Sequence, residues 1–169
     1  MKKRFLVEAC FEAYGVPVID DAQRVFAKSA NSHLYVAIAT GGTATATEMK
    51  LRKSELYEIV NDHRIPVVHM EHRDIQKGKP APDMFAVALQ EMRSRYDAPH
   101  LKPQEVIGFD DTEPGVQSAY RAGLVSVAIP TKWSASQDFS PWTKYKYSSM
   151  TVAIQELSKV FSLPKEVYS

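Results

Sequence analysis

A short apolar run that ends in two adjacent acids constrains the fold of this chain more than any other segment. Val106 to Phe109 reads as a buried strand, Asp110 and Asp111 follow it directly, and Gly115 to Ala122 reads as a helix. This order is typical of α/β folds, in which ligands bind at the carboxyl ends of the strands. Neighbouring carboxylates repel each other unless a cation or proton relieves them, and Mg²⁺ prefers such oxygen donors. The pair therefore predicts a magnesium site; the alternative is that Asp111 or Thr112 merely caps the helix.

Strands and helices alternate along most of the chain. Further apolar runs that read as strands lie at Tyr35–Thr40, Ile65–Val68 and Val125–Ile129. Segments that read as helices lie at Phe5–Tyr14, at Asp20–Ser29, from a capping box at Thr45 to Val60, at Pro82–Arg95 and at Thr151–Phe161. The alternation predicts an α/β fold with three layers, in which helices cover both faces of a mostly parallel sheet.

The composition argues against several classes of function. Lys and Arg total 21 against 20 acids, so the net charge of +1 gives no electrostatic basis for binding nucleic acid. No apolar stretch approaches the roughly 20 residues that span a bilayer, so we expect no membrane partner. The single cysteine, Cys10, cannot form an internal disulfide and suits the reducing cytoplasm.

Three polar features recur at the ends of expected strands or in loops. Thr40 precedes Gly41 and Gly42, Lys79 lies between prolines in the loop from Gly78 to Pro82, and the acid pair follows the next strand. A hydroxyl beside unhindered backbone N–H groups, an ammonium and a metal-binding acid pair are the components that hold a phosphoryl group and offset its charge. The sequence therefore predicts a phosphoryl-binding site.

The order of these features resembles the haloacid dehalogenase superfamily, particularly its phosphatase and β-phosphoglucomutase-like branch. Residues 37–42 resemble the second motif of that family, residues 77–85 the third and residues 106–115 the fourth. The resemblance extends from about Gly15 to Pro130. The third and fourth motifs are specific, whereas the second is weak on its own.

The resemblance implies a role for each residue of the candidate site. Thr40, with Gly41 beside it, contacts the phosphoryl oxygens, and Lys79 bridges the nucleophile and the phosphate. Asp111 contacts Mg²⁺ directly and Asp110 supports it. The implied activity is Mg²⁺-dependent phosphoryl transfer from, or hydrolysis of, a small phosphorylated metabolite.

One essential component of that family is absent from the sequence. Its first motif is an apolar strand ending in Asp-x-Asp-Gly-Thr, whose first Asp attacks phosphorus and whose second acts as general acid and base. No Asp-x-Asp occurs among the 169 residues. The chain resembles a member that begins partway through, whether by natural truncation or by an error in the reading of its gene. We therefore expect a weakened Mg²⁺ site and impaired or absent turnover; the alternative function is a non-catalytic domain that binds phosphate, metal or another protein.

The resemblance also predicts how the chain is organised. We expect a single domain, residues 1–169, with a Rossmann-like core that lacks its first, central strand and most of its helical cap. In this organisation residues 1–14 are a remnant of the cap helix, residues 15–130 carry the core motifs, and residues 131–169 form an irregular tail with a C-terminal helix. A gap is then expected between the strands at 35–40 and 106–109. These strands pair with each other, another segment fills the gap, or a second copy of the chain covers it in a homo-oligomer.

Other interpretations of individual segments are weaker. A strand at Val16–Ile19 could deliver Asp20 and Asp21 to the site, but Pro17 cannot donate to the ladder of a central strand. No His or Lys near Thr40 in the sequence is identifiable as a base that would make its hydroxyl a nucleophile. The segment from His69 to His72 lacks the helical spacing of a zinc motif.

Overall fold

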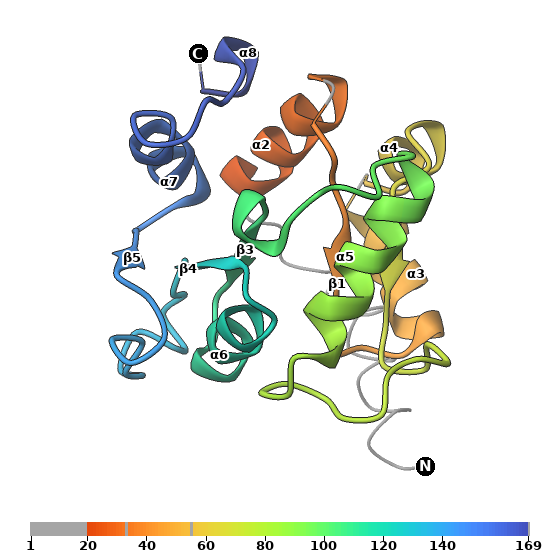
Figure 1. The fold of residues 1–169 in the computed structure, drawn as a ribbon, viewed down its shortest axis with the longest axis horizontal. Helices are drawn as coiled ribbons and strands as arrows, with labels where there is room; N and C mark the ends of the chain where they lie inside the picture. The colour runs from red at the N-terminus through yellow and green to blue at the C-terminus, as the bar shows by residue number, and fades with distance from the viewer. Residues whose placement is uncertain (1–19, 33, 55, 169) are drawn as a thin grey trace.

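Two small parallel sheets form the centre of the structure, a computed structural model that describes residues 20–32, 34–54 and 56–168 (Figure 1). The strands are β1 (Ile38–Ala39), β2 (Val67–Val68), β3 (Ile107–Asp110), β4 (Val125–Ala128) and β5 (Tyr145–Lys146). The helices are α2 (Asp20–Asn31), α3 (Ala44–Lys53), α4 (Tyr57–Asp62), α5 (Asp83–Arg95), α6 (Glu113–Arg121), α7 (Met150–Leu157) and α8 (Lys165–Tyr168), with a 3₁₀ turn η1 at Pro103–Glu105. β1 pairs with β2, and the other sheet has the order β3-β4-β5.

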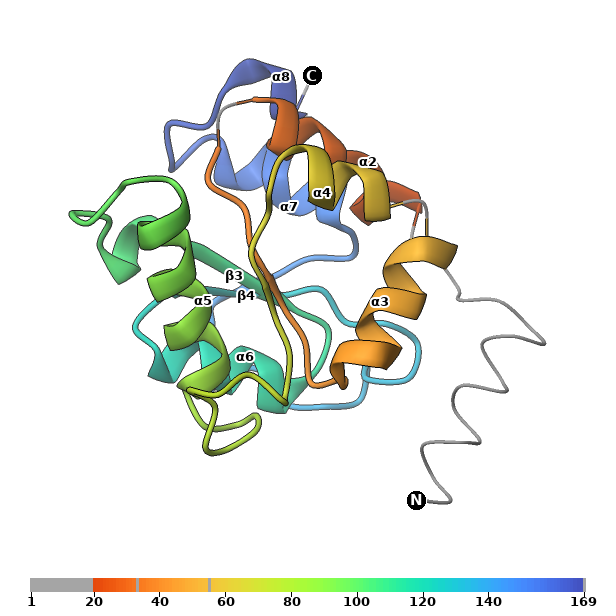
Figure 2. The ribbon, with the colours of Figure 1, turned by 90° about the vertical axis from the view of Figure 1, so that its right-hand side faces the viewer.

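Helices cover the sheets on both faces, as the three-layer prediction requires (Figure 2). On one face, α5 packs on β1 and β2, and α6 packs on β3 and β4. Val68 of β2 lies against Met84 of α5 in this layer. On the other face, Phe109 and Val127 contact the apolar clusters of α7, and Val25 of α2 joins them. The α/β class is thereby confirmed.

The described residues place no strand between β1 and β3, and these two strands are not paired with each other. Each strand hydrogen-bonds only to its outer neighbour: Thr40 N–H donates to Val68 O, and Ile129 N–H donates to Asp110 O. Pairing of β1 with β3, one of the three expected ways to close the gap, is therefore wrong. The expected helix at Phe5–Tyr14 and the alternative strand at Val16–Ile19 lie outside the described residues.

The helix predicted from Thr45 to Val60 is wrong in its start and its length. Thr43 is the N-cap, since its Oγ1 accepts from the N–H of Ala46 at 3.3 Å, so no capping box forms at Thr45. The helix ends at Lys53, and α4 begins separately at Tyr57. The carbonyl of buried Ser54 accepts from Gln23 Nε2 at 2.9 Å, so α2 holds the backbone at the break. This contact comes from 31 residues away and left no signal in the local pattern.

The tail after residue 130 is more regular than predicted. Tyr145 and Lys146 form β5, the outer strand of the larger sheet. Tyr145 and Tyr147 face the α7 layer, whereas Lys146 is exposed on the opposite side and lies over the Phe139 ring. The expected C-terminal helix is present as α7, capped by Ser149, whose Oγ accepts from Val152 N–H. The short α8 was not predicted.

Among the residues that the structure describes, no helix combines the length and apolar character needed to cross a membrane.

Gly108 tests the close approach of β3 and α6. A Cβ at this position would lie 2.9 Å from Ala119 Cβ and 3.3 Å from Leu124 Cδ2, both in the apolar layer. We expect Gly108→Ala to lower the free energy of unfolding by about 1–3 kcal/mol through overpacking, measured by urea denaturation. Gly41→Ala is the matched control: nothing lies within 4 Å of its Cβ position, so its effect stays within about 0.5 kcal/mol. Equal effects of the two substitutions would contradict the packing argument.

Candidate functional site

A pocket of about 540 Å³ opens at the carboxyl ends of β1 and β3. Its walls include all the residues predicted for the site, namely Thr40, Gly41, Lys79, Asp110 and Asp111. The remaining wall residues are Asp21, Ala39, Phe109, Thr112, Ile129 and Met150. The structure therefore brings together side chains that are up to 71 positions apart, between Thr40 and Asp111.

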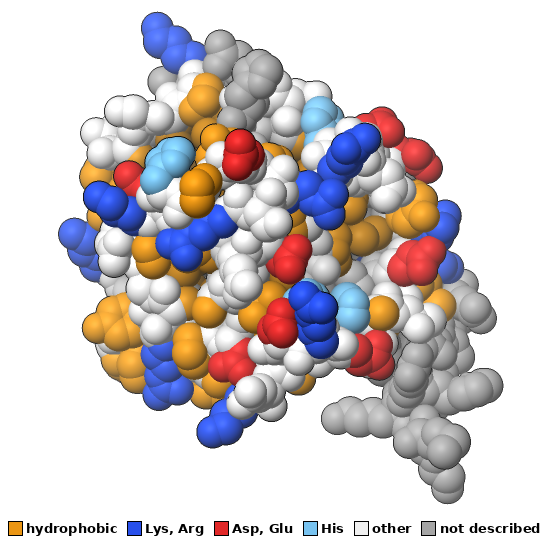
Figure 3. Space-filling model, turned by 45° about the vertical axis from the view of Figure 1, so that its right-hand side comes forward, with side chains coloured by type: hydrophobic (Ala, Val, Ile, Leu, Met, Phe, Trp, Pro, Cys, Tyr) orange, Lys and Arg blue, Asp and Glu red, His pale blue; other side chains and the backbone are white. Residues whose placement is uncertain are grey.

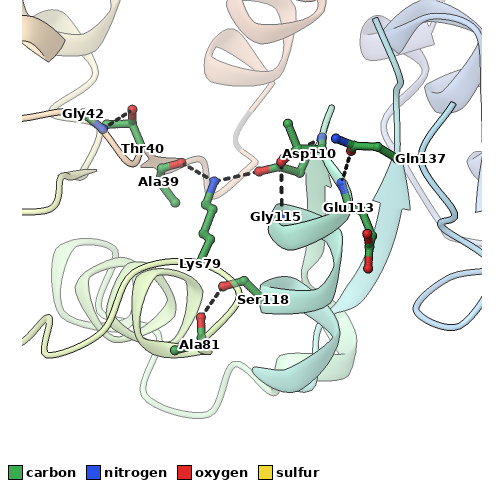
Figure 4. Close-up of polar contacts among 11 residues, drawn as sticks. Ala39, Thr40, Gly42, Lys79, Ala81, Asp110, Glu113, Gly115, Ser118 and Gln137 are labelled. Carbon is green, nitrogen blue, oxygen red and sulfur yellow. Dashed lines mark hydrogen bonds and ion pairs between the residues drawn. The ribbon is translucent and has the colours of Figure 1, made fainter. Parts of the chain in front are cut away.

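Lys79 spans the space between the two sheets (Figure 4). Its Nζ donates to Asp110 Oδ2 at 2.6 Å and to the Ala39 carbonyl at 3.3 Å. The side chains of Lys79 and Asp110 are 18% and 8% exposed, so this ion pair is largely withdrawn from water. One ammonium thus connects the end of β1 to the end of β3.

The other oxygen of Asp110 is held by the start of α6. Asp110 Oδ1 accepts from the backbone N–H of Thr112 at 2.9 Å and from its hydroxyl at 2.7 Å. Thr112 Oγ1 in turn accepts from Gly115 N–H at 3.3 Å and is the N-cap of α6. A Cβ on Gly115 would fall inside the Asp110 carboxyl group, so only glycine fits beneath it. The cap of this helix is therefore Thr112 and not Asp111.

Asp111 remains exposed at the rim of the pocket. Partial burial of its carboxyl group raises the pKa of Asp111 above its ordinary value, and the neighbouring charge of Asp110 adds to the rise. A nearby cation would relieve this penalty on the charged form. The acid pair therefore has the electrostatic character of a cation site.

The donor set of the pocket fits Mg²⁺ better than a metal that needs several protein ligands. In residues 20–32, 34–54 and 56–168, no group of three or more His, Cys, Asp or Glu side chains is arranged to hold a metal. Mg²⁺ keeps several waters and is commonly bound through one or two carboxylates together with substrate phosphates. Asp110 and Asp111 could supply these carboxylates.

Thr40 and Gly41 form the opposite wall. Thr40 Oγ1 accepts from Gly42 N–H at 3.2 Å, which orients the hydroxyl. Gly41 has open space where a side chain would be, so its backbone can be approached closely. At the start of α3, Ala44 N–H donates to Glu71 Oε2 at 3.0 Å.

Asp21 is a wall residue that sequence reasoning raised only as an alternative. It lies in the first turn of α2, and its Oδ2 accepts from Thr151 N–H at 3.1 Å, at the start of α7. The signal was the pair Asp20–Asp21 before an amphipathic helix. Since one oxygen of Asp21 is already used to hold α7, this acid helps to join two helices at the pocket.

The histidines at 69 and 72 do not converge on the pocket walls. His69 Nδ1 accepts from Glu71 N–H, and His72 lies 3.7 Å from Glu91 Oε1 and 3.8 Å from Asp74 Oδ2. The contact between His72 and Glu91 connects the loop before Lys79 to α5, and the other two lie within the loop.

The loop that carries Lys79 is also held by α6. Ser118 Oγ donates to Ala81 O at 2.6 Å (Figure 4). Arg121 Nη1 donates to Pro80 O at 3.2 Å. Asp83 Oδ2 accepts from the N–H groups of Gln76 and Lys77, at 3.0 and 2.9 Å. On the face drawn in Figure 3, acidic, basic and histidine side chains are interspersed with apolar ones.

The comparisons with known proteins agree with this arrangement. The model of the family described as haloacid dehalogenase-like hydrolase matches residues 5–123. The chain is 31% identical over 96 residues to (DL)-glycerol-3-phosphatase 1, mitochondrial, of Arabidopsis thaliana, a match that covers 56% of this chain and 30% of that protein. It is 34% identical over 94 residues to the "Probable pseudouridine-5'-phosphatase" of Drosophila melanogaster, covering 55% of this chain and 37% of that protein. The chain thus matches only about a third of the length of these curated relatives.

Solved structures of the same fold are similar over most of this chain. CbbY from Rhodobacter sphaeroides, solved in complex with phosphate, superposes with a TM-score of 0.61 at 20% identity, covering 76% of this chain and 52% of that one. A haloacid dehalogenase-like protein from Agrobacterium tumefaciens superposes with a TM-score of 0.62 at 15% identity, covering 95% and 78%. At these identities the similarity establishes the fold.

Removal of Lys79 tests the ion pair across the gap. Lys79→Met leaves the Asp110 carboxylate buried without its cation, and we expect the free energy of unfolding to fall by about 3 kcal/mol. Lys79→Met combined with Asp110→Asn is expected to be more stable than Lys79→Met alone, because the uncompensated charge is gone. Urea denaturation of the wild type, both single variants and the double variant provides the cycle. Additive losses would show that the pair is not coupled.

The raised pKa of Asp111 predicts a pH-dependent effect of Asp111→Asn. Because the folded state raises this pKa, the ionised carboxyl disfavours folding at neutral pH, and this penalty disappears as pH falls below the ordinary value of 3.8. We therefore expect Asp111→Asn to be more stable than the wild type at pH 7 and equal to it below pH 3.8.

Asp138→Asn is the control of opposite sign for Asp111→Asn. Hydrogen bonds from the side chain and backbone of Ser140 lower the pKa of Asp138, so its carboxylate favours folding at neutral pH. Its substitution is expected to lose stability at pH 7, and the loss disappears in acid. Thermal unfolding across pH measures both variants. A loss of stability at pH 7 in Asp111→Asn would contradict the assignment.

Proposed function

Because the chain belongs to the haloacid dehalogenase-like hydrolases, we propose that its pocket binds the phosphoryl group of a small phosphorylated metabolite together with Mg²⁺. One observation carries this proposal: Thr40, Lys79 and the acid pair line one pocket although they come from distant parts of the sequence. The relatives named as phosphatases, and the similar CbbY structure that holds phosphate, support the choice of ligand. The single cysteine is consistent with a cytoplasmic location.

The residues divide the binding of a phosphoryl group between the two walls. The Thr40 hydroxyl, oriented by Gly42 N–H, donates to a phosphoryl oxygen, and the open backbone at Gly41 lets the anion approach closely. The Lys79 ammonium provides a positive charge for the phosphoryl group. Its position is already fixed by hydrogen bonds to Ala39 O and Asp110 Oδ2. Because Lys79 is anchored before a ligand arrives, little conformational entropy is lost on binding.

The acid pair holds the cation in this proposal. Asp111 contributes the exposed carboxylate, and Asp110 lies behind it, fixed by Thr112 and Lys79. When bound, Mg²⁺ offsets the negative charge of the phosphoryl oxygens and makes phosphorus more susceptible to attack. With Asp111 as the direct protein donor and Asp110 supporting it, the affinity for the ion alone is weak and rises when phosphate supplies further oxygens.

Attack on phosphorus requires a nucleophile that we do not assign to any residue of this chain. The Asp-x-Asp motif is absent from the sequence, and Asp21, an acid across the pocket, uses one oxygen to hold α7. We propose that the 169 residues bind ligand without turnover. Catalysis then requires an acid carried by a strand between β1 and β3. A second copy of the chain, in a homo-oligomer, would cover the gap between these strands but would also lack the Asp-x-Asp motif.

Calorimetric titration with inorganic phosphate in the presence of Mg²⁺ tests the binding. We expect saturable binding that requires both ions, together with no release of phosphate from glycerol phosphate. Thr40→Val should weaken phosphate binding by about 10- to 100-fold through the loss of one hydrogen bond to a charged group. Asp111→Asn should remove the Mg²⁺-dependent binding of phosphate, whereas Glu156→Gln, which removes a charge from the exposed side of α7, should leave the binding of both ions unchanged.

Each other outcome rejects a specific part of the proposal. The absence of phosphate binding at millimolar concentration would reject the site. Turnover that is proportional to protein concentration and lost in Asp111→Asn would reject the claim that this chain is inactive alone. Turnover that rises with the square of protein concentration would reject it as well, because two copies of this sequence would then suffice for catalysis.

A further inference from the structure

Two residues of the segment after β4, Gln137 and Trp142, form hydrogen bonds with the first turn of α6 outside the pocket. Gln137 Oε1 accepts from the backbone N–H of Glu113 at 2.7 Å, and Figure 4 shows this amide pointing at the N–H. Trp142 Nε1 donates to Glu113 Oε1 at 3.2 Å. Glu113 is therefore held through its main chain and its side chain by residues 24 and 29 positions away.

The N–H groups at the start of α6 can be accounted for one by one. Thr112 N–H donates to Asp110 Oδ1, Pro114 has no N–H, and Gly115 N–H donates to Thr112 Oγ1. Only Glu113 N–H lacks an acceptor within the turn, and Gln137 supplies it. The Gln137 side chain thus completes the hydrogen bonding of the first turn of α6, which directly follows the acid pair.

The position of this turn determines the position of the acids. Asp110 is bonded to Thr112 and lies directly on Gly115, where there is no room for even one further carbon. Any shift of the first turn of α6 therefore moves Asp110 and, with it, the adjacent Asp111. A contact that fixes Glu113 N–H also fixes the carboxylates.

Hydrogen bonds and apolar packing of residues 131–139 hold Gln137 in place. Its N–H donates to Ser134 O at 3.0 Å, and buried Ser134 accepts through Oγ from Thr131 N–H at 3.1 Å. Phe139, 2% exposed, packs against Val116 of α6. The acceptor is thus presented to α6 from a segment that is anchored on both sides of it.

We propose that Gln137 is a positioning residue that orients the Asp110–Asp111 pair for Mg²⁺ by fixing the first turn of α6. This inference rests on the proposed function, since it gives the acid pair its cation. Gln137 touches neither the cation nor the phosphate. It acts through Glu113 N–H, Thr112 and Asp110.

A pair of nearly isosteric substitutions isolates the acceptor. Gln137→Leu keeps the bulk and removes the acceptor, whereas Gln137→Glu keeps an oxygen and adds a charge that the start of a helix favours. We expect Gln137→Leu to weaken Mg²⁺ binding by about 10- to 100-fold, the usual effect of losing an outer support of a metal site, and Gln137→Glu to stay within about threefold of the wild type. Titration with Mg²⁺ at a fixed concentration of inorganic phosphate, followed by NMR shifts of the Gly115 amide, gives both affinities.

A second measurement needs no metal. Hydrogen exchange at the amides of Glu113 and Gly115 is expected to accelerate in Gln137→Leu and to stay close to wild type in Gln137→Glu. Leu157→Ala, which removes a fully buried side chain of α7 on the face of the sheet opposite α6, controls for general destabilisation. It should lower the unfolding temperature and leave Mg²⁺ affinity unchanged.

The outcomes separate this inference from the proposed function. If Gln137→Leu lowers the unfolding temperature as Leu157→Ala does but leaves Mg²⁺ affinity and the exchange of Gly115 unchanged, Gln137 is only structural and the inference is overturned. Equal weakening by Gln137→Leu and Gln137→Glu would also overturn it. If the wild type binds no Mg²⁺, the proposed function fails, and the exchange measurement alone decides whether Gln137 fixes the turn.

Discussion

The ion pair between Lys79 and Asp110 is the interaction on which the arrangement of the site depends. β1 and β3 share no hydrogen bonds in the described part of the chain, so their polar connection at the carboxyl edge is the ammonium that reaches both. Beneath it, Phe85 of α5 packs against Ala119 of α6 and completes the connection with apolar contact. The polar contact sets the distance between the two walls, and the apolar contact makes their approach favourable.

This pairing also determines how charge is distributed before any ligand arrives. Asp110 neutralises Lys79 and accepts from Thr112, while Asp111 keeps a carboxyl whose charged form is disfavoured by burial and by Asp110. The two adjacent acids therefore have different roles. One is a structural partner of the lysine, and the other is available to the solvent side of the pocket.

The sequence allowed the site to be predicted because parallel strands bring their carboxyl ends to one edge. Thr40 directly follows β1 and Asp110 ends β3. Lys79 lies in a loop whose prolines were visible in the sequence, so the convergence of the three residues on one pocket followed from the fold class. Contacts made by irregular segments could not be predicted in the same way. Gln137 bonds to Glu113 from a segment whose sequence has no periodicity. Gln23 of α2 donates to the carbonyl of Ser54, the residue after the end of α3. Such contacts depend on tertiary geometry that neither propensity nor spacing encodes.

The outer edge of the larger sheet, formed by β5, is poorly suited to pair with a strand of another molecule. β5 is only two residues long. Exposed Lys144 directly precedes it, and exposed Lys146 is its second residue. Short, lysine-bearing edges are poor templates for a further strand from another molecule. Strand-to-strand growth from another molecule is thus disfavoured at the β5 edge.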